Sequence, residues 1–137
     1  MSYDLMVFEK TKAPKTKAEF MKWYEVQTGW GEEHDYQTPS VTSPALQNWY
    51  HAMKSVFPPM NGIDAPIDEQ IEENEEQEDC LTDYCIGRDV IYLAFAWSMA
   101  EEAYQVVKKL AKQYDVGFFD VSAEDGDIIL PDGTQIV

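Results

Sequence analysis

The sequence predicts an α+β fold in which an antiparallel sheet carries helices on one face. Short apolar runs, typical of strands, alternate along the chain with segments whose apolar residues recur every three or four positions, as in helices. The helical segments begin at capping signals, and two of the strand runs are separated by a short glycine-containing turn. With 137 residues, close to the commonest domain size, we expect a single domain covering residues 1–137.

The first half of the chain predicts one strand and two helices. Nearly every position from residue 3 to residue 9 is apolar, as in a strand that is covered on both sides or lies in the centre of a sheet. Thr16 and Glu19 have capping-box spacing and predict a helix that runs to Gly29. Ser43-Pro44 predicts a second helix start. The apolar stripe of that helix is expected to comprise Leu46, Trp49, Tyr50, Met53, Val56 and Phe57.

The second half predicts a hairpin, a helix and one or two strands. Residues 81–86 and 90–97 are strand-like and flank a turn at residues 87–89, with Trp97 on the same inward face as Phe95. Ser98 and Glu101 have capping-box spacing, and the helix they predict runs to about Tyr114. Strands are expected at 118–121 and, shorter, at 128–130. The expected order is β-α-(α)-β-β-α-β. If the extra helix and the acidic loop are left out, this is the ferredoxin-like order β-α-β-β-α-β.

The net charge of −16 is unevenly distributed. Residues 1–63 contain seven acids and six lysines, whereas the stretch from Asp64 to Asp83 contains ten acids and no Lys or Arg. We name residues 64–80 the acidic segment and predict that it is a solvated, mobile loop, because its few apolar residues bury too little surface to order it. Such a charge argues against a nucleic-acid partner and against an anionic membrane, and it favours a basic protein partner.

The acidic residues of two loops are the candidate partner-binding residues. Charge blocks of this kind are often interaction segments, and equally often they only solvate a loop. The candidates are Glu32, Glu33, Asp35, Asp68, Glu69, Glu72, Glu73, Glu75, Glu76, Glu78 and Asp79.

The sequence offers little catalytic machinery. Phosphate-loop, nucleophile-elbow and zinc-protease motifs are absent, so we predict no catalytic residues, no cofactor and no metal site. Cys80 and Cys85 are expected to be free thiols, because two cysteines fall short of the four ligands of a structural zinc site. His51 is expected on the surface. His34, beside Glu33, Asp35 and Tyr36, is the one candidate general base.

The beginning of the chain lacks the basic-then-apolar pattern of a signal peptide, and no apolar run has the length of a membrane span. The sequence therefore predicts a cytoplasmic protein.

Four segments resemble parts of small bacterial proteins: residues 1–9, 57–62, 82–98 and 116–122. In size and acidity the chain is similar to immunity proteins of contact-dependent and polymorphic toxin systems. The resemblance implies a cytoplasmic, non-catalytic protein that binds and blocks a basic toxin, often a nuclease, and it assigns no residue roles. Two other hypotheses remain open: a small enzyme or ligand-binding domain that uses the His34 loop, and a DNA mimic that presents carboxylates with the spacing of phosphates.

Overall fold

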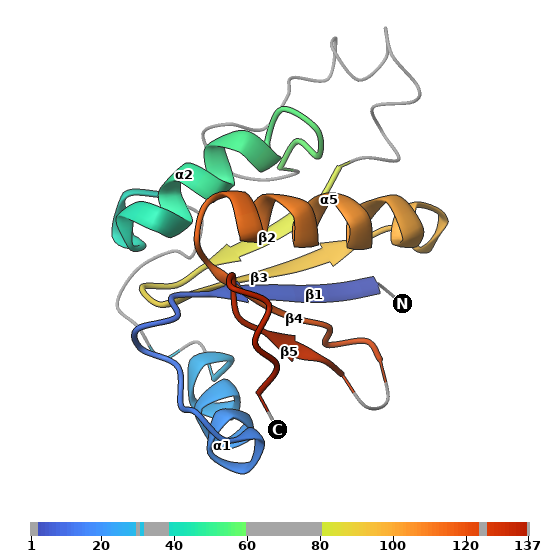
Figure 1. Ribbon diagram of the computed structural model, residues 1–137. Coiled ribbons are helices and arrows are strands. Elements are labelled where there is room, and N and C mark those ends of the chain that lie inside the picture. Colours follow the sequence, from blue (N-terminus) through green and yellow to red (C-terminus); the bar gives the residue numbers. More distant parts are fainter. Residues whose placement is uncertain (1–2, 30, 32–38, 60–80, 124–125, 137) are drawn as a thin grey trace, which may run out of the picture.

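The elements follow one another in the expected order (Figure 1). The computed structural model describes residues 3–29, 31, 39–59, 81–123 and 126–136. In this part of the chain, three helices accompany one five-stranded antiparallel sheet with the strand order β2-β3-β1-β4-β5. The strands are β1 (Tyr3–Phe8), β2 (Asp83–Ile86), β3 (Val90–Phe95), β4 (Gly117–Phe119) and β5 (Ile128–Ile129), and the helices are α1 (Lys17–Gln27), α2 (Pro44–Met53) and α5 (Ala100–Gln113).

Strand β1 lies at the centre of the sheet, between β3 and β4. All four residues from Leu5 to Phe8 are fully buried, and they alternate between two clusters. Leu5 and Val7 belong to one cluster, whereas Met6 and Phe8 belong to the other. Because side chains alternate across a strand, these two clusters lie on opposite faces of the sheet. The prediction that this strand is covered on both sides is confirmed.

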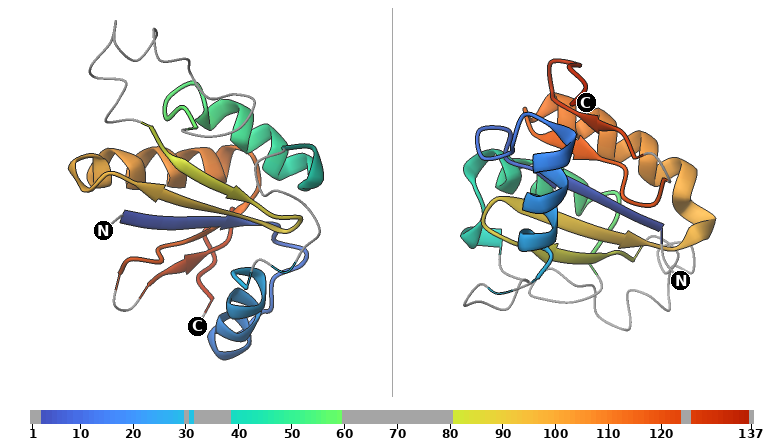
Figure 2. Two further views of the ribbon diagram at one scale, coloured as in Figure 1. Left: turned by 180° about the vertical axis from the view of Figure 1, so that it is seen from behind. Right: turned by 90° about the horizontal axis from the view of Figure 1, so that it is seen from below.

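Helices α2 and α5 cover one face of the sheet (Figures 1 and 2). The predicted stripe of α2 is buried, except that Val56 is 46% exposed because the helix ends at Met53. In α5 the buried positions follow helical spacing and are Ala103, Val107 and Ala111. These residues belong to the same buried cluster as the inward side chains of β3, which are Ile91, Leu93 and Phe95.

Helix α1 lies on the opposite face. Phe20 is fully buried there, and its ring lies 5.0 Å from that of Phe8 and 5.3 Å from that of Phe119. The expectation of helices on one face therefore holds for α2 and α5, while α1 covers part of the other face. The α+β class is confirmed. The closer assignment to the ferredoxin-like order stays a prediction, because α1 and β5 add to that pattern.

The capping predictions have different outcomes. Thr16 caps α1 as expected, since its hydroxyl accepts a hydrogen bond from the backbone N–H of Glu19 at 3.3 Å, and Ser43 caps α2 in the same way. The cap at Ser98 is wrong. The chain forms a 3-10 turn over Trp97–Met99 before α5 begins at Ala100, and no side chain caps this helix.

The same turn explains the position of Trp97. The predicted hairpin forms with the expected register, but β3 ends at Phe95, so the alternation of inward and outward residues stops there. Trp97 is 50% exposed and packs against Tyr3, with the ring centroids 5.4 Å apart. The prediction that Trp97 faces inward is therefore wrong.

Candidate functional site

All eleven predicted partner-binding residues lie outside the described residues, as does His34. They are Glu32, Glu33, Asp35, Asp68, Glu69, Glu72, Glu73, Glu75, Glu76, Glu78 and Asp79. The structure therefore tests neither their spacing nor the proposed role of His34. It does describe the residues on either side of the acidic segment.

The described residues on either side of segment 60–80 lie next to each other. Pro59 and Thr82 form a parallel β-bridge, and the N–H of Thr82 donates to the carbonyl oxygen of Pro58 at 2.9 Å. Nearby, the hydroxyl of Tyr84 donates to the carbonyl oxygen of Phe57 at 2.7 Å. Thr82 is fully buried and Tyr84 is 6% exposed. The residues that flank segment 60–80 thus lie beside β2, an outer strand of the sheet.

The described residues are close to neutral. They contain all ten Lys and Arg residues of the chain and twelve of its 26 Asp and Glu residues, which gives a net charge of −2. The other fourteen acids belong to residues 32–38, 60–80 and 124–125, and nine of them lie between 60 and 80. The large negative charge is therefore carried by segments that connect the elements, while the helices and strands are nearly balanced.

Four lysines surround the turn at residues 131–133, which we name the C-terminal turn. It follows β5, the strand at the opposite edge of the sheet from β2. Lys108 and Lys112 stand on α5 on one side of this turn, and Lys10 and Lys15 follow β1 on the other side. The acidic segment is attached at the β2 edge, whereas these lysines lie at the β5 edge, where Asp115 and Asp132 also lie near Lys10.

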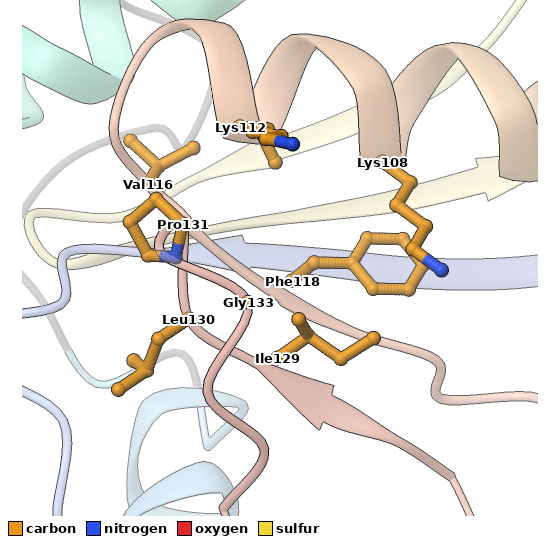
Figure 3. Close-up of a pocket in the computed structure, with 9 residues that line it drawn as sticks. Lys108, Lys112, Val116, Phe118, Ile129, Leu130, Pro131 and Gly133 are labelled. Carbon is orange, nitrogen blue, oxygen red and sulfur yellow. The ribbon is translucent and has the colours of Figure 1, made fainter.

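An apolar cleft of about 170 Å³ separates α5 from the C-terminal turn (Figure 3). Its walls are formed by Ala111, Val116, Phe118, Ile129, Leu130, Pro131 and Gly133. Lys108 and Lys112 lie on the α5 side of the opening, one helical turn apart. The ammonium group of Lys108 lies 5.4 Å from the centroid of the Tyr104 ring. We name this site the α5 cleft.

A second cleft of about 220 Å³ lies on the other side of Leu130 and is lined by Lys10, Ala13, Pro14, Lys15, Leu130, Thr134, Gln135 and Ile136. The ammonium group of Lys10 forms an ion pair with Asp115 at 2.6 Å, so its charge is already compensated. The walls also include the polar side chains of Thr134 and Gln135. This cleft is therefore the more polar of the two, and one of its two lysines, Lys10, is paired.

On the side of the sheet opposite α2 and α5, Tyr24 of α1, Tyr92 of β3 and Asp4 of β1 form a hydrogen-bonded group. The hydroxyl of Tyr92 donates to Asp4 Oδ2 at 2.5 Å, and Tyr24 interacts with Tyr92 through a side-chain hydrogen bond. Burial, followed by the hydrogen bond to Asp4, raises the pKa of Tyr92, and burial raises the pKa of Tyr24. These phenols are neutral at pH 7, which suits a structural role.

The described cysteine is also protonated at neutral pH. Burial, with a smaller contribution from Asp83, raises the pKa of the Cys85 thiol to about 11. A reactive thiol needs the opposite shift, because only the thiolate is nucleophilic. Within the described ranges, no three His, Cys, Asp or Glu side chains are grouped as metal ligands would be. His51 is exposed, as predicted.

Comparison with family models, curated proteins and solved structures finds no match to this chain. None of the helices in the described part has the length and apolar character that crossing a membrane requires.

The α5 cleft was not predicted from the sequence. Lys108 and Lys112 lie near the end of a predicted helix, where cations complement the helix dipole, and many lysines share this role. Their i, i+4 spacing around the small residue Ala111 was the available signal. This spacing alone does not indicate a cleft, because the opposite wall is formed by the C-terminal turn, which is distant in the sequence.

Proposed function

We propose that this chain is a non-catalytic binding protein of the immunity type, which neutralises a basic toxin by forming a complex with it. The observation that carries the proposal is the partition of charge. The described residues have a net charge of −2, whereas segments 32–38, 60–80 and 124–125 contain fourteen acids and no Lys or Arg.

This uneven distribution of charge would increase the rate at which the chain associates with a basic protein. Complementary charge accelerates the encounter of two proteins, and the gain in association rate decreases as salt screens the attraction. The bridge between Pro59 and Thr82 fixes where nine of these acids are attached to the fold. A basic partner would therefore be attracted toward the β2 edge rather than toward the lysines at β5. The cytoplasm is the compartment that this proposal requires, because an immunity protein meets its toxin inside the cell it protects.

The test uses a variant in which Glu72, Glu73, Glu75 and Glu76 are all changed to Lys, which brings the net charge from −16 to −8. The matched control changes Glu19, Glu25, Glu101 and Glu102 to Lys. These four are exposed, described residues, and the control has the same final charge. Far-UV circular dichroism and thermal unfolding check that both variants fold.

Each tagged form is used to retain partners from extracts of the native host, and the retained protein is purified and identified. We expect a basic protein that binds the wild type and the control but binds the acidic-segment variant at least about tenfold more weakly. Co-expression of the wild type should also protect growing cells from that protein. Equal binding by both variants, or a partner whose toxicity is unaffected by the chain, would contradict the proposal.

A further inference from the structure

We propose that the α5 cleft is a binding site for a small organic anion that joins a carboxylate to an apolar group about the size of a benzene ring. The apolar group would occupy the space between Ala111, Phe118 and Ile129, and the carboxylate would lie at the opening beside Lys108 and Lys112. The inference does not depend on the proposed protein partner.

The size and lining of the cleft define the apolar part of the ligand. Seven of the nine lining residues are apolar or glycine, and the two lysines are the others. An enclosed apolar cavity of about 150 Å³ is known to hold a benzene molecule, so a cleft of about 170 Å³ accommodates a single ring or a short branched alkyl group. Larger ligands exceed it, since drug-sized molecules occupy clefts of about 300 Å³ or more.

The two lysines define the charge of the ligand. Within the described part of the chain, neither ammonium group forms an ion pair with a carboxylate, although the whole chain contains 26 acids. Lysines four residues apart on a helix repel one another, so their placement over one apolar opening is unfavourable without an anion. The partial negative charge at the C-terminal end of α5 would repel an anion, so the lysines themselves must supply the attraction.

The geometry around Lys108 supports the same conclusion. Its ammonium group is held near the ring and the hydroxyl of Tyr104, at 5.4 Å from the ring centroid and 3.4 Å from the oxygen. The Tyr104 ring in turn packs edge-on against Phe118, with the centroids 5.5 Å apart, and Phe118 is a wall of the cleft. The Tyr104 ring that positions one charge at the opening therefore also packs against a wall of the cleft, Phe118.

The second cleft lacks this combination. The charge of Lys10 is compensated by Asp115, and Asp132, whose pKa is lowered chiefly by the backbone N–H of Thr134, also interacts with Lys10. An anion placed there would compete with two carboxylates. The second cleft therefore provides an internal comparison for the experiment.

The test is an NMR titration of the ¹⁵N-labelled full chain with three probes. Benzoate has both parts of the proposed ligand, acetate has only the carboxylate, and benzyl alcohol has only the ring and a neutral polar group. We expect benzoate to cause saturable shifts of amides around the α5 cleft, including Ala111, Val116 and Gly133. Acetate and benzyl alcohol should bind at least about tenfold more weakly, because each lacks one of the two interactions.

Two double variants identify the source of the affinity. Lys108→Gln with Lys112→Gln removes both charges at the opening, and we expect benzoate binding to weaken at least about tenfold. Lys109→Gln with Lys22→Gln is the matched control. Both of its positions are exposed and helical, and neither lines the cleft, so this variant should bind benzoate as the wild type does.

Three results would overturn the inference. The first is that benzoate and acetate cause the same unsaturable shifts spread over all lysine-bearing surfaces. The second is that benzoate shifts are centred on the second cleft, around Thr134 and Ile136. The third is that the Lys108 and Lys112 double variant binds benzoate with unchanged affinity.

Discussion

Gly117 occupies a position at which no side chain fits. It pairs with Phe8 across β1 and β4, and a Cβ atom added to it would lie 2.2 Å from two carbons of the Phe8 ring. Carbon atoms in contact are normally about 3.5–4.0 Å apart, so the ring would have to move by more than about 1 Å. Phe8 is fully buried, and the Phe20 and Trp23 rings lie 5.0 Å and 6.1 Å from it. The ring therefore has no free space to enter.

We expect Gly117→Ala to lower the free energy of unfolding by about 2–3 kcal/mol, because overpacking a filled core costs about 1–3 kcal/mol and this overlap is severe. The opposing gain from a stiffer unfolded chain, about 0.4–1 kcal/mol, is too small to compensate. Urea and thermal unfolding followed by circular dichroism measure the change.

Gly31→Ala is the matched control. An added Cβ at Gly31 meets no atom of the described residues within 4 Å beyond its chain neighbours, so stability should stay within about 0.5 kcal/mol of the wild type. Adding Phe8→Leu to Gly117→Ala should relieve the overlap, so the double variant should lose less than the sum of the two single losses. A Gly117→Ala protein as stable as the wild type would refute this account of the β1–β4 contact.

Two further predictions concern buried hydroxyl and thiol groups. Tyr84→Phe should lower the free energy of unfolding by about 1–2 kcal/mol, because it leaves the buried carbonyl of Phe57 without its donor. Tyr104→Phe, whose hydroxyl lies 3.4 Å from the Lys108 ammonium, should change it by less than about 0.5 kcal/mol. Equal losses in urea unfolding would contradict this prediction. Burial raises the pKa of Cys85 from 9.0 to about 11 and that of Tyr3 from 10.0 to about 12, so above pH 9 the unfolded chain loses these protons before the folded chain does. Stability should therefore fall as pH rises from 9 to 12, and a free energy of unfolding that increases over this range would be the opposite result.

The sequence predicted the order of the elements well, because local patterns encode it. The apolar run around Leu5–Phe8, the capping residue Thr16 and the glycine turn after Ile86 each act over a few residues. Where a tertiary contact determines the position of an element, the prediction from the sequence was incomplete. The placement of α1 opposite α2 and α5 depends on Phe20 packing against Phe8 and Phe119, and no spacing within the helix specifies that partner.

The end of β3 shows a second limit of sequence patterns. Alternation continues in the sequence from Ile91 through Phe95 to Trp97, whereas the backbone leaves the sheet after Phe95 and turns toward α5. Residue type alone does not mark this departure, since tryptophan is common in strands. The α5 cleft is a similar case, because its two sides come from residues 108–118 and 129–133 and meet only in the folded chain.

The proposed function depends on a charge surplus that lies outside nearly neutral helices and strands and would attract a basic partner. The most direct measurement is the association rate constant with the purified partner, determined by stopped flow at a series of salt concentrations. For the wild type and for the control with Glu19, Glu25, Glu101 and Glu102 changed to Lys, we predict a steep decrease with increasing salt. For the variant with Glu72, Glu73, Glu75 and Glu76 changed to Lys, the rate should be slower and much less dependent on salt. The same salt dependence in both variants would contradict the central claim.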